Sequence, residues 1–596
     1  MHKLGHIEIS NFRSCKNVSL PLESFTPLVG QNNSGKSTIL EAINLVLKPS
    51  SFSENDFSDS STPIIISARI DGINSNILDR LPEQKHRKAI EPFCTDGYLW
   101  IRICANGTSK SSLKQEVYDY TLYSGEGVPT EWRDHPTGLP QAITALLPEP
   151  LQIEAMKDIS EDLGKAKAGT TIKTLLDEIM EPILRAHEDL NNALSTVKNI
   201  LTSAGDNRSG HLKEFDEKAS EALENFFPGL TLDLDLQVIE VKEFFKAGNL
   251  HITDKVSGMR HRFDQMGTGT QRAIQMALIR YLADAKSDPT EKSSRRLLLI
   301  DEPELFLHPQ GIRRLRHALE ELSASGFQVV FSTHSPLMLS RENAADTIIV
   351  TKSFDTGTLT RKPLRVAVNT ALTDSESQSR TLFELGNLSE IYFSDLVVLC
   401  EGKTDKRLLP LVYELIYGHQ PELDHICFLA VGSCSDIPKA LIVLQAMGIK
   451  SCAVADLDFA FTEGRKGGNA LLNKDADDLK KAKEILMELM KTNDFSLGDN
   501  GLPVNDKAKT FSSSDAWALF AKDSNGKFIS ESVQNQLKSK MVWIWSEGSI
   551  EDVTGHAEKG ESAIIKQEQI LRSLPAQQIE DSMPSFKKCF EWIKSL

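Results

Sequence analysis

The sequence has no long hydrophobic run and no clustered cysteines, and each absence excludes a class of protein. Of its 596 residues 40% are hydrophobic, but no apolar stretch reaches the roughly 18 residues that a membrane-spanning helix needs. The eight cysteines are scattered without a CxxC pair, so neither a disulfide framework nor a zinc site is predicted. The first residues lack the pattern of a secretory leader. We therefore expect a cytoplasmic protein without a membrane partner.

Positive charge is also scarce. The chain has 67 lysines and arginines against 83 aspartates and glutamates, which gives a formal net charge of −16. Because contacts to DNA phosphates need lysine and arginine, this balance does not by itself favour a nucleic-acid function. A negative net charge does not exclude a locally basic groove, although short clusters of lysine and arginine more often lie on solvated helix faces. The candidates form two short clusters, Arg313, Arg314 and Arg316, and Lys403, Lys406 and Arg407.

What the chain does contain is a glycine-rich loop near its start. Residues 30–37 read GQNNSGKS and lie between a predicted strand, 25–29, and a predicted helix, 38–47. Glycines let backbone N–H groups approach phosphates, and the following helix places its positive end there. In this pattern the lysine reaches the β- and γ-phosphates and the serine holds Mg²⁺. The sequence thus predicts an ATP site that includes Asn32, Asn33, Gly35, Lys36, Ser37 and Thr38.

A later segment supplies the carboxylates that this site requires. Four apolar residues, 297–300, precede Asp301 and Glu302, which is typical of a buried strand that delivers two acidic side chains. We expect Asp301 to bind Mg²⁺ through water and Glu302 to polarise the attacking water. His334 follows the next strand-like run, 328–332, where it could contact the γ-phosphate. On its own, such a histidine would more often be structural.

A separate acidic pattern lies in the last third of the chain. Glu401 follows an apolar run, and Asp405 comes about one helical turn later; Asp456 and Asp458 follow another strand-like run. In extended geometry the last two side chains point to the same face. Strands here alternate with helices, which predicts a parallel sheet with ligands at the carboxyl ends of its strands. Carboxylates suit Mg²⁺ or Mn²⁺, and two such ions could activate a water and stabilise a leaving oxygen.

The first motifs resemble those of the ABC-type ATPases of the RecF, SMC and OLD class. The resemblance rests on DEPE at 301–304, His308-Pro309 and STHSP at 332–336. That class has a signature loop before the acidic strand, and GTGTQR at 267–272 occupies this place. The resemblance implies a homodimer that encloses ATP, with Thr268, Gly269 and Gln271 contacting the nucleotide. Thr270 departs from the commonest form of the signature, which has glycine there.

The second pattern is similar to the Toprim domain of topoisomerases, primases and OLD-family nucleases. It consists of EGxxD at 401–405, Gly432, and DxD at 456–458. An acidic surface without catalysis is the plainer alternative. In OLD-type nucleases a later carboxylate and a lysine supplement this core. The candidates for the carboxylate are Glu551 and, as the alternative, Asp552, and those for the lysine are Lys559 and Lys566.

Together the motifs resemble the overcoming-lysogenization-defect (OLD) nucleases. The resemblance implies an α/β chain, with an ABC-type ATPase head that carries a helical insertion, followed by a Toprim Rossmann-like parallel-sheet domain. The insertion would serve as a dimerisation arm, or as a plain spacer. The expected boundaries are an ATPase lobe at 1–148, the insertion at 149–228, a second lobe at 229–370, a linker at 371–390 and the Toprim domain at 391–596.

The function implied is an ATP-hydrolysing, divalent-metal-dependent DNA endonuclease or nickase that serves bacterial anti-phage defence. The ATPase site would hold Mg²⁺ through Ser37 and Asp301. The Toprim site would hold Mg²⁺ or Mn²⁺, as two ions. The expected catalytic residues are Glu302, His334, Glu401, Asp456, Asp458 and Lys559, and the expected Toprim ligands are Glu401, Asp405, Asp456, Asp458 and Glu551.

The partners implied are DNA, a second copy of the chain, and a separate helicase-like protein or a reverse transcriptase with its RNA–DNA product. The alternative is a RecF- or SMC-like DNA-repair clamp whose Toprim domain binds DNA without cutting it. A topoisomerase is disfavoured because none of the eight tyrosines lies in an evident helix-turn-helix. A primase is disfavoured because no zinc site is predicted.

Overall fold

The computed structural model of the chain describes residues 2–79, 81, 83–119, 132–147, 150–153, 188–201, 207–224, 234, 251–255, 257–285, 296–386, 389–555 and 561–596. They form two compact units, and each is described by itself. The first contains Met1–Arg13, Pro21–Phe25 and Ser37–Thr333, and the second contains Ser14–Leu20, Thr26–Lys36 and His334–Leu596. No helix in the described part is long and apolar enough to cross a membrane.

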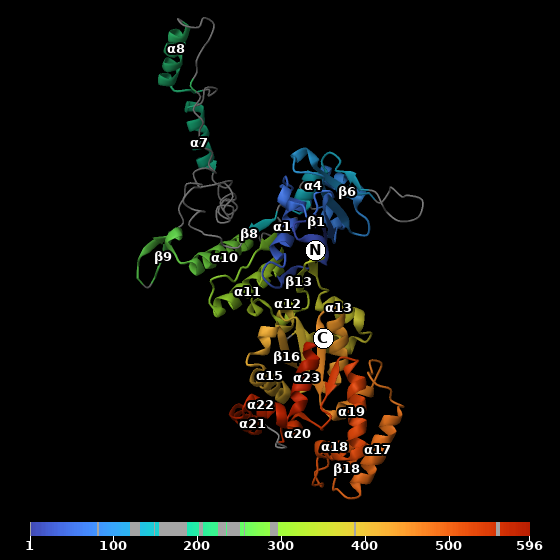
Figure 1. Cartoon of the computed structure of the whole chain (residues 1–596). Helices are drawn as coiled ribbons and strands as arrows, with labels where there is room; N and C mark the ends of the chain where they lie inside the picture. Colours follow the sequence, from blue (N-terminus) through green and yellow to red (C-terminus); the bar gives the residue numbers. More distant parts are fainter. Residues whose placement is uncertain are drawn as a thin grey trace. The chain divides into compact units, whose positions relative to one another are not determined.

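The first unit begins with an antiparallel sheet (Figure 1). Its strands pair in the order β1-β4-β5-β6-β7. In β5 every second residue is buried, as expected for a strand with one face against the core. The bounds are β1 (Lys3–Phe12), β4 (Ile64–Asp71), β5 (Leu99–Ala105), β6 (Leu113–Tyr118) and β7 (Trp132–Asp134), and the short helices beside them are α2 (Ser75–Leu78), α3 (Gln84–Ile90) and α4 (Leu139–Leu146).

Three parallel strands of the first unit carry the predicted acidic turn. The strand β11 (Arg296–Ile300) pairs with β8 (Leu151–Ile153) on one side and with β12 (Phe327–Thr333) on the other. Its residues 297–300 are fully buried, which explains their continuous apolar sequence. The helices of this part are α1 (Lys36–Leu47), α10 (Thr268–Ala285) and α11 (Pro309–Ala324). The predicted strand before Asp301 and the predicted helix at 38–47 are confirmed.

The predicted helical insertion is described only in part. Two helices, α7 (Glu188–Leu201) and α8 (Gly210–Glu224), lie within it, while residues 154–187, 202–206 and 225–233 are outside the described residues. Residues 235–250 are also outside them. A short hairpin of β9 (His251–Thr253) and β10 (Arg260–Arg262) follows.

The second unit begins with the strands around the glycine-rich loop. The strand β3 (Phe25–Val29) pairs in parallel with β13 (Ile348–Ser353), and β13 pairs antiparallel with β14 (Gly357–Thr360). The strand β2 (Cys15–Pro21) and the short helix α12 (Arg341–Ala344) complete this part. The strand predicted at 25–29, directly before the loop, is confirmed.

The segment predicted as a linker at 371–390 is largely helical. The helix α13 (Leu364–Ala371) leads into it, and α14 (Ser375–Gly386) occupies most of it. Among the residues of α14 whose side chains are described, Ser377, Thr381 and Leu385 are buried, and they recur every four residues as one helix face does. Two of these three are polar, so they add nothing to a hydrophobic periodicity.

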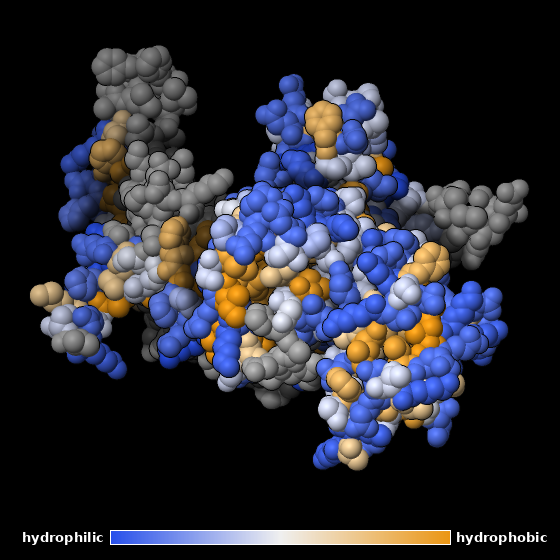
Figure 2. All heavy atoms as spheres, turned by 60° about the horizontal axis from the view of Figure 1, so that its bottom comes forward, coloured by the Kyte–Doolittle hydropathy of each residue, from blue (hydrophilic) through white to orange (hydrophobic). Residues whose placement is uncertain are grey.

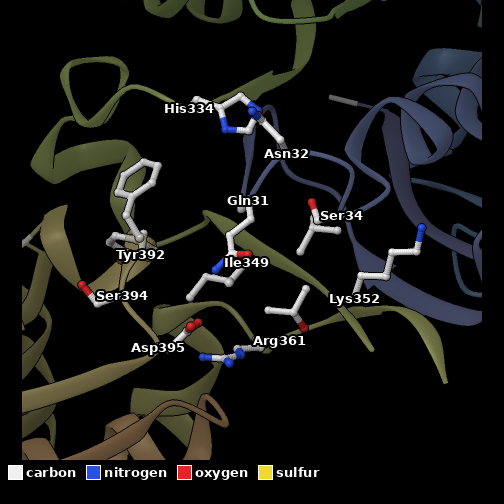
Figure 3. A pocket seen from close by; sticks show the side chains of 14 residues that line it. Gln31, Asn32, Ser34, His334, Ile349, Lys352, Arg361, Tyr392, Ser394 and Asp395 are labelled. Atoms are coloured by element: carbon white, nitrogen blue, oxygen red, sulfur yellow. The ribbon is translucent and has the colours of Figure 1, made fainter. Parts of the chain in front are cut away.

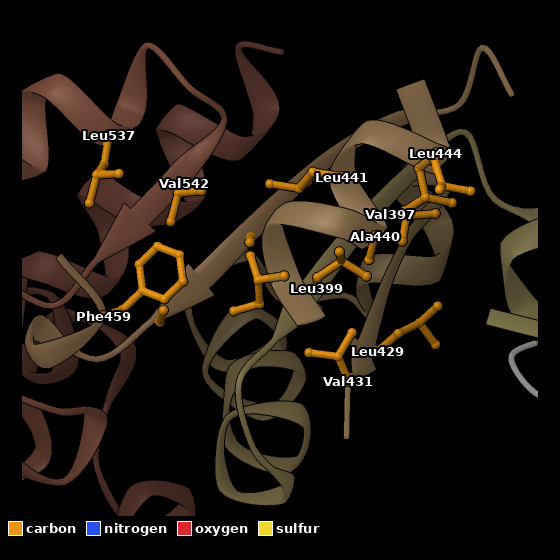
Figure 4. Packing of buried hydrophobic residues seen from close by; sticks show 14 of the residues in the cluster. Val397, Leu399, Leu429, Val431, Ala440, Leu441, Leu444, Phe459, Leu537 and Val542 are labelled. Atoms are coloured by element: carbon orange, nitrogen blue, oxygen red, sulfur yellow. The ribbon is translucent and has the colours of Figure 1, made fainter. Parts of the chain in front are cut away.

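The predicted parallel sheet of the last domain is confirmed. Its strands are β15 (Leu396–Cys400), β16 (Ile426–Ala430), β17 (Lys450–Ala455) and β20 (Val542–Ile544), in the order β16-β15-β17-β20 and all parallel. Val397 and Leu399 of β15 belong to the hydrophobic cluster drawn in Figure 4. The alternate residues Leu396, Val398 and Cys400 belong to a second cluster. Both faces of the sheet are therefore covered. The helices α15 (Lys403–Tyr417) and α16 (Ile437–Ala446) connect the first three strands.

A helical insert separates β17 from β20, and a helical segment follows β20. The insert contains α17 (Asp477–Met490), β18 (Ser496–Leu497), β19 (Pro503–Val504), α18 (Ser513–Lys522) and α19 (Ser524–Lys538). The final helices are α20 (Ile550–Thr554), α21 (Glu561–Ser573), α22 (Ala576–Ser582) and α23 (Pro584–Lys594).

The surface drawn in Figure 2 is largely hydrophilic, with hydrophobic patches between the polar residues. A largely hydrophilic surface is expected where amphipathic helices pack their apolar side inward.

Candidate active sites

The glycine-rich loop has a backbone that only glycine can adopt at two positions. Gly30 has a φ of 151° and Gly35 a φ of 108°. A Cβ on Gly30 would lie 2.0 Å from the Val350 carbonyl oxygen, and one on Gly35 would lie 2.2 Å from Thr358 Oγ1. Asn33 also has a left-handed backbone, with a φ of 61°. The loop thus lies directly against β13 and β14, and its shape depends on both glycines.

Lys36 closes this loop from inside. It is only 4% exposed, and its ammonium group donates hydrogen bonds to the carbonyl oxygens of Gly30 at 3.1 Å and Gln31 at 2.9 Å. Ser37 and Thr38 follow in the first turn of α1. A helix N-terminus with a lysine directly beside it is an arrangement that binds phosphate.

A cavity of about 310 Å³ lies beside the loop and brings His334 together with Asn32 and Ser34 (Figure 3). The Ser34 hydroxyl is buried and has no hydrogen-bond partner in the described part of the chain. Arg361 lines the same cavity, where burial lowers its pKa and the charge of Asp395 partly opposes that effect. The sequence predicted His334 and Asn32 at the ATP site, but not Arg361.

The acidic turn after β11 is held by two hydroxyl groups from the end of β12. Ser332 Oγ donates to the Asp301 carboxylate and accepts the Glu302 backbone N–H at 2.9 Å. Thr333 Oγ1 donates to Glu304 Oε1 at 2.6 Å. Glu302 itself has a left-handed backbone, with a φ of 45°. A non-glycine residue held in that conformation marks a turn whose shape is fixed by its surroundings.

The predicted signature loop lies at the start of α10. A Cβ on Gly269 would lie 2.7 Å from the Phe306 carbonyl oxygen. Gln271 is buried, and its side-chain amide donates to the carbonyl oxygens of Phe263 and Met266, each at 2.9 Å. Gln271 therefore shapes the loop itself. The side chain of Thr268 lies outside the described residues.

Arg272 is a residue of this loop to which the sequence assigned no role. Its side chain is fully buried, and its guanidinium donates to the carbonyl oxygens of Asp301 at 3.1 Å, Glu302 at 3.2 Å and Pro303 at 3.2 Å. It also donates to Gln275 at 2.9 Å. Burial lowers its pKa to about 10, against the opposing charges of the nearby carboxylates. One side chain thus joins the signature helix to the acidic turn.

Replacing Arg272 with alanine is expected to lower ATP hydrolysis by about tenfold and the unfolding temperature by a few degrees, because buried carbonyl groups lose their donors. Steady-state ATP hydrolysis and thermal unfolding measure both effects. Arg272→Lys should recover part of each, and Arg313→Ala, at an exposed position on α11, is the matched control. Values for Arg272→Ala equal to those of the control would contradict this role.

The second site is an acidic group at the carboxyl ends of β15 and β17. One carboxylate oxygen from each of Glu401, Asp456 and Asp458 lies within 4.8 Å of the others. The Asp456 backbone N–H donates to Glu401 Oε2 at 3.1 Å. The prediction that these three residues meet at one edge of the sheet is therefore confirmed.

The predicted extended geometry of Asp456 and Asp458 is wrong. The strand β17 ends at Ala455, Asp456 begins a short 3-10 helix, Leu457–Ala460, and Asp458 lies within it. The Phe459 N–H donates to the Asp456 carbonyl oxygen at 3.2 Å, which closes the turn, and the Leu457 N–H donates to the Gly548 carbonyl oxygen at 2.7 Å. The two carboxylates still converge, but through a helical turn.

Burial and mutual repulsion disfavour ionisation of this group. The pKa of Asp456 is raised well above its usual value by burial first, and then by the charges of Glu401, Asp405, Asp458 and Glu551. Burial and Glu551 raise the pKa of Asp405 to about 7. Among the described residues, Asp405 Oδ1 and Asp456 Oδ1 are buried without a hydrogen-bond partner. Carboxylate oxygens without hydrogen-bond partners can coordinate a divalent cation, which would stabilise the charged forms of both side chains.

The later acidic candidates are now distinguishable. Asp552 accepts hydrogen bonds from the Ser549 N–H at 2.9 Å and the Ser549 hydroxyl at 2.7 Å, so it caps α20. Glu551 instead acts electrostatically on Asp405 and Asp456. The structure thus favours Glu551 as the additional carboxylate. Lys559 lies outside the described residues, and Lys566 is exposed on α21, so the identity of the lysine stays a prediction.

A cavity of about 320 Å³ adjoins the acidic group. Its other side comes from the insert and from the loop after β20, and none of these residues was predicted. They are Asn505, Ser512, Ser513, Ser514, Trp517, Gly548 and Ser549.

The metal-free protein is expected to lose stability as the pH rises toward about 7. The pKa of Asp405 is about 7 in the folded state, whereas an unfolded aspartate titrates near ~4. Below the unfolded pKa, neutral Asp405 therefore makes its full contribution to the free energy of unfolding. That contribution is lost as the pH rises through the folded pKa. Thermal unfolding in EDTA should fall by a few degrees between about pH 5 and pH 8. Asp405→Asn should flatten this slope, and an unchanged slope would contradict the assignment.

Comparison with known proteins matches two parts of the chain to known domain families. Residues 3–97 and 102–339 match the AAA ATPase domain, and residues 392–458 match the TOPRIM domain of overcoming lysogenization defect protein-like proteins. The chain is 36% identical to the Old nuclease of Escherichia phage P2 over 94% of each chain. It is 24% identical to the OLD nuclease of Thermus scotoductus, over 76% of this chain and 82% of that protein.

Solved structures of SMC head domains are also similar to part of the chain. The head domain from Pyrococcus furiosus, bound to the C-terminal domain of ScpA, aligns with 62% of this chain and 98% of its own length, at 16% identity and a TM-score of 0.36. The assignment of the chain to a family therefore rests on the sequence matches alone.

Proposed function

The chain belongs to the Old nuclease family, and from this premise we propose that it is a divalent-metal-dependent DNA endonuclease or nickase, driven or controlled by ATP, that acts in anti-phage defence. The family makes it an ATPase and a nuclease. The observation that carries the proposal is the convergence of the Glu401, Asp456 and Asp458 carboxylates at the ends of β15 and β17, where Asp456 Oδ1 is buried without a hydrogen-bond partner among the described residues. Such a group is costly to fold unless it binds cations.

The residues that would hold Mg²⁺ or Mn²⁺ are Glu401, Asp456 and Asp458, with Asp405 and Glu551 beside them. Bound there, the metal would activate a water molecule and stabilise the leaving oxygen of the phosphodiester. Asp405 is held at the start of α15 by the Gly402 N–H, which donates to it at 3.3 Å. Its charge adds to the negative field that attracts the cation.

For ATP hydrolysis we assign Lys36 and the loop N–H groups to the phosphates, and Ser37 and Asp301 to Mg²⁺. Glu302 would orient the attacking water, and His334 would contact the γ-phosphate. Ser332 donates to the Asp301 carboxylate and accepts the Glu302 N–H, and these two hydrogen bonds hold the turn that carries both acidic residues. The signature loop at 267–272 would act on the nucleotide of a second copy of the chain, so we propose a homodimer. Closure of that dimer would regulate DNA cleavage.

The test is incubation of the purified chain with supercoiled plasmid and Mg²⁺ or Mn²⁺, beside a Glu401→Ala/Asp456→Ala variant. Nicking or linearisation by the wild type alone is the expected result. Equal cutting by both proteins would mean that the chemistry lies elsewhere. DNA binding without cutting, in the presence of both metals and ATP, would favour the alternative, a DNA clamp of the RecF or SMC kind.

A further inference from the structure

The cavity beside the acidic group has two chemically different sides. Glu401, Asp456 and Asp458 form one side, and the start of α18 forms much of the other. The acidic side offers only acceptors for cations. The α18 side carries hydroxyl groups, an amide and the N-terminal N–H groups of a helix, which bear partial positive charge. A cavity of about 320 Å³ is large enough to hold a ligand between them.

The N-terminus of α18 is only partly satisfied within the protein. Ser512 caps it by accepting the Asp515 N–H at 3.2 Å, and Asn505 Oδ1 accepts the Ser513 N–H at 2.9 Å. Ser513 Oγ donates to the Pro503 carbonyl oxygen at 3.1 Å. Ser514 remains, and its N–H and its hydroxyl make no hydrogen bond with the described residues. Two donors are therefore available at a helix N-terminus that lines the cavity.

The opposite side of the cavity also has an unsatisfied group. Asp456 Oδ1 is buried without a hydrogen-bond partner among the described residues, and Asp456 lines the cavity. A buried carboxylate oxygen without a donor fits a site that holds an ion or another ligand. A metal at the carboxylates would satisfy the acidic side only, whereas the donors of α18 match an anionic acceptor.

The packing of α18 fixes this geometry. Gly548, in the loop after β20, has a φ of 130°, and a Cβ there would lie 3.4 Å from the Cα of Ala518 in α18. Trp517 is buried and stacks on Phe461 with ring centroids 4.8 Å apart. Phe461 directly follows the 3-10 helix that carries Asp458. The helix start and the acidic group are thus joined by packed residues, so their spacing is preorganised.

We propose that the N-terminus of α18 binds a phosphate group of the DNA strand that is cut, through the Ser514 N–H and hydroxyl, with the Asn505 amide beside them. This inference rests on the proposed nuclease function. For a nuclease, the phosphodiester backbone presents an anion to the helix N-terminus and also needs the metal group across the cavity. Helix N-termini bind phosphates through the same N–H groups. The Asp515 carboxylate does not compete, since it accepts from the Ser512 N–H at 2.8 Å and from the Ser512 hydroxyl.

The test uses the full chain and two substitutions at one position. Ser514→Ala removes the hydroxyl, and Ser514→Glu adds a charge that repels phosphate. The matched control is Ser524→Glu, at an exposed serine in the first turn of α19, which does not line the cavity. The affinity for a short fluorescein-labelled DNA is measured by anisotropy in Ca²⁺, beside plasmid nicking in Mg²⁺ and Mn²⁺ binding followed by electron paramagnetic resonance.

Ser514→Glu is expected to weaken DNA binding and nicking by about tenfold or more, and Ser514→Ala by severalfold, as for a lost hydrogen bond to a charged group. Mn²⁺ binding should be retained, and Ser524→Glu should match the wild type. Equal DNA affinity for Ser514→Glu and Ser524→Glu would overturn the inference.

Because DNA affinity is the primary measurement, the inference and the nuclease function can fail separately. A wild-type chain that binds DNA without cutting it would remove the nuclease function, whereas a Ser514-dependent affinity would still support the phosphate contact. A wild-type chain that binds no DNA would overturn both. Loss of Mn²⁺ binding in Ser514→Ala would also overturn the inference, because the residue would then act on the metal group.

Discussion

Replacing Asp456 with asparagine is expected to abolish DNA cleavage while raising the thermal stability of the metal-free protein. The pKa of Asp456 is raised well above its usual value by burial and by the charges of four neighbouring acidic residues. Asparagine has nearly the same shape without the charge, so it removes that repulsion. Cleavage should fall by more than about 100-fold, because a metal ligand is lost. The unfolding temperature in EDTA should rise by a few degrees.

The divalent cation separates this explanation from a general effect on folding. Mn²⁺ should raise the unfolding temperature of the wild type by mass action, and it should raise that of Asp456→Asn much less. Asp499→Asn, at an exposed aspartate between β18 and β19, is the control and should leave all three quantities unchanged. An Asp456→Asn protein that is less stable than the wild type in EDTA would contradict the repulsion, and one that cuts DNA normally would contradict the catalytic role.

Lys36→Ala is expected to lower ATP hydrolysis by about 100-fold or more, because the lysine supplies positive charge where the transferred phosphoryl group becomes most negative. The ammonium group is already enclosed by the loop, where it donates to the Gly30 and Gln31 carbonyl oxygens. Its removal should therefore also weaken ATP binding, which a fluorescent ATP analogue would measure. Lys48→Ala, just beyond the other end of α1 at an exposed position, is the matched control and should hydrolyse ATP like the wild type.

The same variant tests whether ATP controls cleavage. If closure of an ATP-bound dimer regulates the nuclease, ATP should change plasmid nicking by the wild type and leave nicking by Lys36→Ala unchanged. Nicking by Lys36→Ala that matches the wild type both with and without ATP would contradict the coupling. That outcome would leave the acidic group and its chemistry intact, because those residues lie far from Lys36 in the sequence.

The sequence predicted those parts of the sites that are local in the chain. The glycine-rich loop, the acidic turn after β11 and the carboxylates after β15 and β17 each follow a buried strand, and a strand end with a characteristic residue can be recognised in one short window. The path of the chain between Asp456 and Asp458 was predicted wrongly, since the strand ends at Ala455 and a 3-10 helix follows, whose Leu457 N–H contacts Gly548, far away in the sequence.

The parts that were missed depend on tertiary contacts. Arg272 looks like any arginine on a helix, and only the fold shows that its guanidinium meets three carbonyl groups of the acidic turn. Ser514 lies in a plain capping sequence more than fifty residues after Asp458, and only the packing of α18 brings it to the cavity. In the helix α14, two of the three side chains described as buried, Ser377 and Thr381, are polar, and such positions give no hydrophobic signal.

The most direct test of the central claim is an anomalous difference map from crystals of the full chain grown with Mn²⁺. We expect Mn²⁺ density in contact with the carboxylates of Glu401, Asp456 and Asp458, the three residues whose oxygens already converge. An ordered acidic group without Mn²⁺, in a protein that still nicks plasmid in the same buffer, would show that the cleavage chemistry belongs to another site.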